Sequence, residues 1–171
     1  MASEGATPAK PGAGRWLIGG LVLLVPAVVF ALLGTQGQVS AVRPADQKFL
    51  TENKAKDGVV TTASGLQYKV LRPGKGPRPG ANDWVQVHYV GRLVDGTTFD
   101  SSYARGTPAV FQLGDVIPGW REGLQLMNAG ARYQLVIPSA LGYGPAGQGP
   151  IPPGATLVFD VELLGVAPAE R

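Results

Sequence analysis

The sequence predicts an α+β fold in which an antiparallel sheet wraps around one short helix, behind a single apolar segment near the N-terminus. From Val59 onward, apolar residues recur mostly at every second position, as in strands with one buried face. Clusters of glycine and proline separate these runs, and the 25 glycines and 15 prolines among 171 residues indicate many turns. Beyond residue 58, helical spacing is confined to 120–128. A chain of this length suffices for one domain with a substantial core.

The predicted strands are each defined by apolar residues of one parity, which we expect to face the core. These residues are Leu66, Tyr68 and Val70; Val85, Val87, Tyr89 and Leu93; Leu135 and Ile137; and Leu157, Phe159, Val161 and Leu163. Turn-forming clusters at 73–80, 95–98 and 142–154 lie between them. In the predicted helix, Trp120, Leu124 and Met127 follow at i, i+4 and i+7, so they share one apolar face.

The N-terminal segment Trp16 to Leu33 is eighteen residues long and carries no charge. At about 1.5 Å per residue, a helix of this size approaches the hydrocarbon thickness of a bilayer. We therefore expect a transmembrane anchor over 16–34. Residues 1–15 would be a cytoplasmic tail, because Lys10 and Arg15 precede the segment. The alternative is a signal peptide cleaved near residues 39–41. A buried core helix is disfavoured because a helix of a small domain normally has a polar face.

Residues 35–57 are interpreted as a linker that contains a short helix at 46–57. Asp46 is its expected N-cap, Phe49 and Leu50 form a small apolar patch, and Gly58 would end it. We interpret this helix as a spacer in preference to a docking or dimer contact. The folded domain is then expected to span 58–171.

Several kinds of chemistry are disfavoured by what the sequence lacks. There is no cysteine, so disulfides and thiolate catalysis are excluded. The single histidine, His88, has the opposite parity to Tyr89 and should point away from the core. Residues 58–171 carry nine basic and eight acidic side chains, which argues against nucleic-acid binding. No phosphate-binding loop or metal-ligand spacing is present, so no cofactor or metal is predicted.

A set of aromatic and apolar residues at predicted strand ends and loops is the remaining candidate for a site. Its members are Tyr89, Phe99, Phe111, Val116, Ile117, Trp120, Tyr143 and Phe159. An ordinary core explains most of them. Two features favour a binding site: Tyr143 lies in a loop rich in glycine and proline, and Asp100 directly follows Phe99. The residues alone leave both interpretations open.

Three long motifs in this region resemble the FKBP-type peptidyl-prolyl cis/trans isomerase family. They are VQVHYVGRLVDGTTFDSS at 85–102, FQLGDVIPGWREGLQLMNAGAR at 111–132, and PSALGYGPAGQGPIPPGATLVFDVELLGV at 138–166. The stretch ENKAKDGVVTTASGLQYKVL at 52–71 is similar to the lead-in of bacterial Mip-like members. The resemblance spans residues 52–166 and does not cover 1–45. It implies an FKBP-like half-barrel sheet of five to six antiparallel strands around one helix.

The resemblance also implies a role for each site residue. Trp120 would form the floor of an apolar pocket, and its walls would be Tyr89, Phe99, Val116, Ile117, Tyr143 and Phe159. Asp100 would accept a hydrogen bond from Tyr89, with Arg105 nearby, while Phe111 and Ile151 would border the substrate. The Ile117 N–H and the Tyr143 hydroxyl would hold substrate carbonyls. Ala109 departs from the family, in which many members have an aromatic residue at this place.

These features predict a non-covalent isomerase that acts on X–Pro bonds of unfolded or exported polypeptides. The membrane would be contacted through 16–34, and macrolide inhibitors of the family are possible ligands. The catalytic domain would then lie in a bacterial periplasm, anchored to the inner membrane or released after signal cleavage. Two alternatives from other classes are a holdase or binding module that isomerises little, and a purely structural membrane protein.

Overall fold

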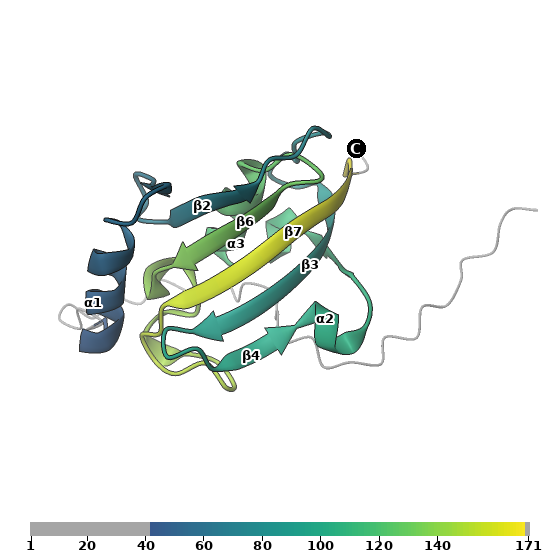
Figure 1. Ribbon diagram of the computed structural model, residues 1–171. Helices are drawn as coiled ribbons and strands as arrows, with labels where there is room; N and C mark the ends of the chain where they lie inside the picture. Colours follow the sequence, from purple (N-terminus) through teal and green to yellow (C-terminus); the bar gives the residue numbers. More distant parts are fainter. Residues whose placement is uncertain (1–41, 170–171) are drawn as a thin grey trace, which may run out of the picture.

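A computed structural model describes residues 42–169, which form an α+β domain (Figure 1). Its elements, in chain order, are α1 (Pro44–Asn53), β1 (Val59–Thr61), β2 (Gln67–Arg72), β3 (Trp84–Leu93), β4 (Thr98–Ser101), α2 (Ser102–Arg105), β5 (Ala109–Gln112), η1 (Leu113–Asp115), α3 (Pro118–Gln125), β6 (Arg132–Ile137), η2 (Ser139–Leu141), η3 (Gly144–Ala146) and β7 (Leu157–Ala167). The predicted α+β class is confirmed: α3 is the short helix expected inside the sheet, α1 overlaps the helix expected at 46–57, and α2 was not predicted.

The described strands form one seven-stranded antiparallel sheet in the order β1-β2-β6-β7-β3-β4, with β5 paired to β3. β3 pairs with β7 along its whole length, while β4 and β5 share its other edge. The short helix α2 lies between these two edge strands in the chain. The sheet has more strands than the five to six that the resemblance implied, and the alternation in the sequence missed β1, β4 and β5, because strands of three or four residues show too little of it.

The core lies between the sheet and α3, which crosses behind the sheet in Figure 1. The inward parity predicted for β3 and β7 is confirmed along both strands. Trp120, Leu124 and Met127 are fully buried, as their helical spacing predicted. The helix begins at Pro118, two residues before the predicted start, because proline at the first helical position has no N–H to satisfy.

The parity predicted for β2 is wrong at two positions. Val70, expected to be buried, is 43% exposed and lies beside an irregularity in the pairing with β6. Gln67, expected to face solvent, is 4% exposed. Its side chain accepts a hydrogen bond from Asn53 Nδ2 (2.8 Å) and donates one to the Leu50 carbonyl (2.9 Å). The helix α1 therefore covers a face of β2 that the sequence pattern assigned to solvent.

The helix α1 also differs from its prediction. It spans Pro44–Asn53, Arg43 is its N-cap, and it ends before Gly58. Asp46 is in the first turn and fully buried, so it is not an N-cap. Because Asp46 and Asn53 both form hydrogen bonds with the rest of the domain, the interpretation of this helix as a spacer is wrong.

The predictions for 1–15, for the apolar segment 16–34 and for 35–41 fall outside the described residues. Between residues 42 and 169, no helix has the length and apolar character needed to cross a membrane.

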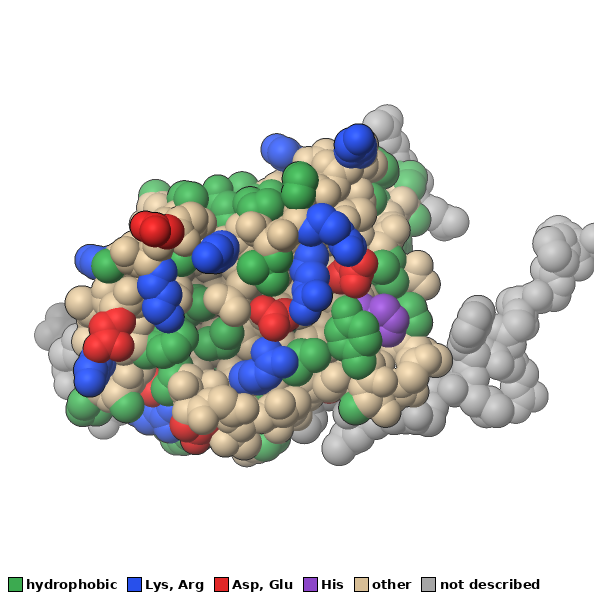
Figure 2. Space-filling view, in the orientation of Figure 1, with side chains coloured by type: hydrophobic (Ala, Val, Ile, Leu, Met, Phe, Trp, Pro, Cys, Tyr) green, Lys and Arg blue, Asp and Glu red, His purple; other side chains and the backbone are tan. Residues whose placement is uncertain are grey.

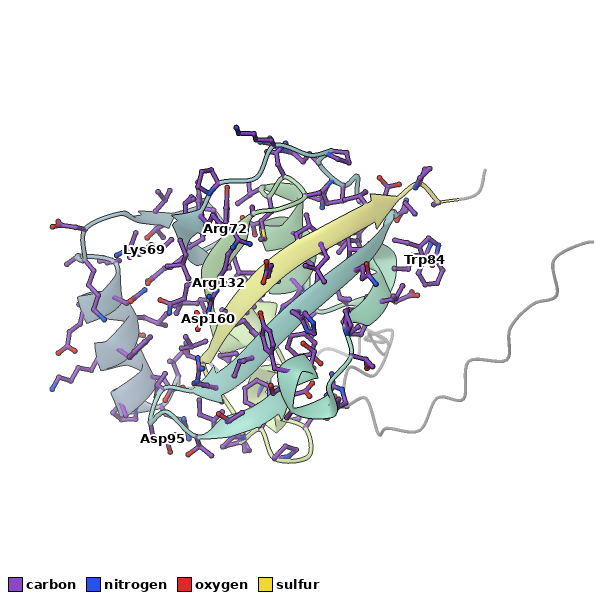
Figure 3. The ribbon with its side chains drawn as sticks, turned by 45° about the vertical axis from the view of Figure 1, so that its right-hand side comes forward. Lys69, Arg72, Trp84, Asp95, Arg132 and Asp160 are labelled. Atoms are coloured by element: carbon purple, nitrogen blue, oxygen red, sulfur yellow. The ribbon has the colours of Figure 1, made fainter. Side chains whose placement is uncertain are left out.

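The face of the sheet turned away from α3 is polar. Figure 2 shows acidic and basic side chains interspersed on it, and Figure 3 labels Arg72, Arg132 and Asp160 along it. Arg72 is paired with Glu162 there. The Arg72 guanidinium lowers the pKa of Glu162, mainly through its hydrogen bond. His88 lies on this face, as predicted, and its ring stacks on Tyr103 with centroids 4.4 Å apart.

Candidate active site

Five aromatic rings from five separate elements meet on the α3 side of the sheet. Trp120 of α3 is fully buried and packs edge-on against Tyr89 of β3 (centroids 5.1 Å apart) and Phe159 of β7 (5.2 Å). Phe111 of β5 lies 5.7 Å from Trp120, and Phe99 of β4 lies 5.5 Å from Phe159. Perpendicular packing of this kind is a favourable geometry for aromatic pairs. Trp120, Tyr89 and Phe159 thus form a buried floor, and Phe99 and Phe111 form a half-buried rim.

Gly91 makes this cluster possible, although the sequence analysis did not single it out. A Cβ atom at this position of β3 would lie 2.6 Å from a ring carbon of Phe159 and 2.7 Å from one of Phe99. No side chain fits there without moving an aromatic ring. The signal in the sequence was a glycine inside an otherwise regular strand, which often marks a place where another group lies close to the strand backbone.

A hydrogen-bonded group of polar side chains borders the cluster. The Tyr89 hydroxyl donates to Asp100 Oδ2 (2.5 Å), and Arg105 donates both to the other oxygen of Asp100 and to the Tyr89 hydroxyl (2.8 Å). Burial, and then the hydrogen bond to Asp100, raise the pKa of Tyr89 well above its ordinary value. The Tyr89 phenol therefore keeps its proton and remains a donor at neutral pH.

The helix α2 holds Arg105 in place. Ser101 caps it by accepting the Ala104 N–H (3.2 Å), and Gly106 ends it with φ +75°. Ser102 is fully buried, and its hydroxyl accepts the Tyr89 backbone N–H (2.8 Å). Ser102 thereby ties α2 to the strand that carries Tyr89. This role was not predicted, because a serine gives no local signal of a partner on another element.

The 142–156 loop carries two further predicted site residues, Tyr143 and Ile151. Ile151 is buried in the hydrophobic core of the domain, and the half-buried Tyr143 packs against this core. Burial and the negative charge of Asp100 raise the pKa of Tyr143 to about 12, so the two side chains influence one another. A two-way backbone bridge between Gln148 and Ile151 closes the tip of the loop (2.9 Å in both directions).

Val116 and Ile117 lie between η1 and α3 and are both buried. Among the hydrogen bonds of residues 42–169, none has the Ile117 N–H as donor. The following Pro118 begins α3 and lacks only its own N–H, so the Ile117 donor is intact. Over the same residues, no group of three or more acidic, histidine or cysteine side chains is arranged to hold a metal ion.

The structure joins seven of the predicted site residues into one group, in which five rings pack against one another and Asp100 and Arg105 are hydrogen-bonded to Tyr89; the other four, Val116, Ile117, Tyr143 and Ile151, lie in the hydrophobic core or against it. The apolar members belong to the hydrophobic core of the domain or pack against it. Asp100 and Arg105 are joined to this core by their hydrogen bonds with Tyr89. The site residues are Tyr89, Phe99, Asp100, Arg105, Phe111, Val116, Ile117, Trp120, Tyr143, Ile151 and Phe159. What each residue does toward a substrate remains a prediction.

Comparison with known proteins gives the family. Residues 76–164 match the model of the FKBP-type peptidyl-prolyl cis-trans isomerase, and residues 34–70 match that of the domain amino terminal to it. The chain is 54% identical over 120 residues to the FKBP-type peptidyl-prolyl cis-trans isomerase FkpA of Aeromonas hydrophila, covering 70% of this chain and 45% of the relative. It is 50% identical over 122 residues to the outer membrane protein MIP of Legionella longbeachae, covering 71% and 52%.

A crystal structure of a peptidyl-prolyl cis-trans isomerase from Pseudomonas syringae pv. tomato superposes with a TM-score of 0.70 at 45% identity. The match covers 78% of this chain and 99% of that one. The chain spans about half the length of the two curated relatives described above. The family match over 76–164, the conserved fold and the identity to these relatives together establish that this chain belongs to the FKBP-type peptidyl-prolyl cis-trans isomerase family.

Proposed function

We propose that this chain is a peptidyl-prolyl cis/trans isomerase that accelerates rotation about X–Pro bonds without a covalent step. The observation that carries the proposal is the aromatic cluster, in which the buried floor of Trp120, Tyr89 and Phe159 is bordered by half-buried rings and one hydrogen-bonded carboxylate. A proline ring is a compact apolar group, and a floor of aromatic rings binds such a group away from water.

The physical problem is the partial double bond of the amide. Its rotational barrier is about 18–20 kcal/mol, and spontaneous X–Pro exchange takes roughly tens to hundreds of seconds. No bond has to be broken, so a site needs only to bind the twisted amide better than either planar form. Each tenfold acceleration requires about 1.4 kcal/mol of such preference. Burial of one apolar side chain is worth about 1.5–3 kcal/mol, of which only the part gained in the twisted state contributes to the rate.

Polar groups at the rim would orient the substrate. The Ile117 N–H and the Tyr143 hydroxyl are proposed to bind substrate carbonyls on either side of the proline. Asp100 is proposed to act through its charge and by orienting Tyr89, not as a proton shuttle. This assignment agrees with its two hydrogen-bond partners, which occupy both carboxylate oxygens. Val116, Phe111 and Ile151 would complete the apolar lining.

The substrates are proposed to be proline-containing polypeptides that are unfolded or exported. The support for an envelope location is the apolar segment 16–34 together with the name of the Legionella relative, an outer membrane protein. We propose that 16–34 anchors the chain to the inner membrane with the domain in the periplasm, the alternative being release after cleavage. Sequencing the N-terminus of the mature protein distinguishes these two forms. Macrolide inhibitors of the family are proposed ligands of the same aromatic cluster.

The test is a protease-free assay of the purified full-length chain. Exchange NMR on an X–Pro tetrapeptide measures both binding and the rate of cis/trans interconversion. Phe99→Ala removes one ring of the rim and should lower kcat/KM by about 2- to 12-fold, the equivalent of one aromatic contact. Tyr103→Ala is the control, because Tyr103 is 47% exposed on the opposite face of the sheet. Binding of the peptide without faster exchange would instead indicate a holdase or binding module.

A further inference from the structure

The helix α1 presents a buried carboxylate to a distant part of the chain. Asp46 is fully buried, and its Oδ2 accepts the backbone N–H of Thr156 at 2.5 Å. Its Oδ1 accepts two hydrogen bonds from Arg43, from Nε at 3.1 Å and from Nη2 at 2.8 Å. Asp46 is therefore a fully paired buried charge, and one of its partners is 110 residues away in the sequence.

Thr156 is the point at which the 142–156 loop joins β7. Ala155, Thr156 and Leu157 are all buried, so a backbone N–H here has no access to solvent. The preceding Pro152 and Pro153 have no N–H to offer. The Asp46 carboxylate is thus what satisfies the last buried donor before the sheet ladder begins at Leu157. Without it, Thr156 would carry an unpaired buried donor, which is costly.

The loop is closed on itself and is held to the domain at its ends. The Gly154 N–H donates to the Gly144 carbonyl (3.0 Å), and Gln148 and Ile151 exchange two backbone hydrogen bonds. A loop with these internal bonds moves as a unit when its attachment loosens. Tyr143 and Ile151 belong to this unit, so their positions in and against the hydrophobic core depend on how its end is held.

We propose that Asp46 is a positioning residue of the isomerase site, which fixes the end of the 142–156 loop and through it the placement of Tyr143 and Ile151. This inference rests on the proposed function. It assigns to α1 a part in substrate binding, although no residue of α1 belongs to the aromatic cluster.

The other end of α1 supplies a matched control. Asn53 is buried and donates to Gln67 of β2 at 2.8 Å, and none of its described contacts involves the loop. Asn53→Ala and Asp46→Ala each remove one buried anchor of the same helix. Only Asp46→Ala removes the partner of Thr156.

The experiment compares full-length wild type with Asp46→Ala, Asp46→Asn and Asn53→Ala by hydrogen exchange and by peptide kinetics. Asp46→Ala should speed exchange of the Thr156 amide and of amides in 142–155 by about 5- to 150-fold, the equivalent of losing one buried hydrogen bond. Asn53→Ala should leave the exchange rates of these amides unchanged when they are compared with the exchange rates of the β7 amides in the same variant. Asp46→Asn keeps an acceptor oxygen for Thr156 and should restore most of the protection.

In the kinetic arm, Asp46→Ala should raise KM for X–Pro peptides more than it lowers kcat, because the loop binds substrate and the aromatic floor is unchanged. Equal effects of Asp46→Ala and Asn53→Ala on loop exchange and KM would overturn the proposal, as would unchanged loop exchange in Asp46→Ala. If Asp46→Ala does not fold, the same comparison is made with Arg43→Ala, which removes the two donors that hold Asp46 Oδ1 and should also speed exchange of the Thr156 and loop amides. If the wild-type chain shows no isomerase activity, the proposed function fails by itself, and the affinity for a proline peptide replaces KM as the readout of loop position.

Discussion

Replacing Gly91 by alanine tests whether the packing of Phe99 against Phe159 determines the geometry of the site. The added Cβ would lie 2.6 Å from Phe159 Cε1, and 2.7 and 2.8 Å from two ring carbons of Phe99. Ordinary carbon contacts are about 3.5–4.0 Å, so both rings must give way, by about 1 Å in sum for each contact, and the more exposed ring is expected to move further. Phe159 is 1% exposed and held against Trp120, whereas Phe99 is half-buried. We therefore expect Phe99 to be displaced from the rim.

The expected cost follows from this displacement. Overpacking a well-filled core destabilises by about 1–3 kcal/mol, which a denaturant titration of the full-length chain measures. Displacement of Phe99 together with a shift of the buried floor ring Phe159 should lower kcat/KM for an X–Pro peptide by about 10- to 100-fold, more than Phe99→Ala, which leaves the floor in place. Exchange NMR gives this second quantity without a coupling protease.

Substitutions at two other glycines serve as controls that distinguish an effect on stability from an effect on site geometry. At Gly165 of β7 an added Cβ would meet only Gln86 atoms at 3.8 and 3.9 Å, so Gly165→Ala should change neither quantity. Gly96 has φ +89° and open space around it, so Gly96→Ala should lose about 1 kcal/mol of stability and keep full activity. Wild-type kcat/KM in Gly91→Ala would refute the reasoning, because the Phe99–Phe159 contact would then have no part in the rate.

Three further predictions concern charged and titrating groups. Asp100→Asn keeps an acceptor for Tyr89 but loses the charge paired with Arg105, and should lower kcat/KM by about tenfold; full activity would show that the charge is dispensable. The pKa of Tyr143 is raised, so its contribution to the free energy of unfolding is complete below pH 10 and is lost as pH rises toward about 12. Tyr143→Phe should make this alkaline decline shallower in denaturant titrations between these pH values, and an unchanged slope would contradict the assignment. The pKa of Glu162 is lowered, so its contribution is present above its ordinary value near 4.5 and is lost as pH falls through the folded-state pKa. The acid decline in stability should therefore be shallower in Glu162→Gln, and an identical decline would exclude a role for the pair with Arg72.

The longest periodic elements were predictable from the sequence. β3 alternates along its ten residues and β7 from Leu157 to Leu164, and the Trp120 face of α3 repeats at helical spacing. Such patterns arise because one face of each element is buried, whatever its neighbours are. β1, β4 and β5 have three or four residues each, too few for a pattern to stand out. These three strands were therefore missed, in addition to the burial of Gln67 and the docking of α1.

The candidate site divides in a similar way. Its apolar members and Asp100 were predicted because they stand within long motifs of a known family. Gly91 and Ser102 were missed, because one is defined by the absence of a side chain between two rings and the other by a hydrogen bond to β3. The burial of Gln67 was also missed, because it depends on a hydrogen bond from Asn53, and the helix that carries Asn53 was interpreted as a spacer outside the domain.

The sequence by itself determined the α+β class, the inward parity of β3 and β7 and the aromatic composition of the site. The parity was predictable because an element with one buried face has apolar residues at a regular spacing. Only the tertiary structure decided which polar side chains are buried and which groups they form hydrogen bonds with. Asp46 resembles an N-cap at the level of sequence, yet its carboxylate accepts a hydrogen bond from an N–H that is 110 residues away along the chain. A polar group is stable in the interior only when it has a partner, and the fold, not the local sequence, supplies that partner.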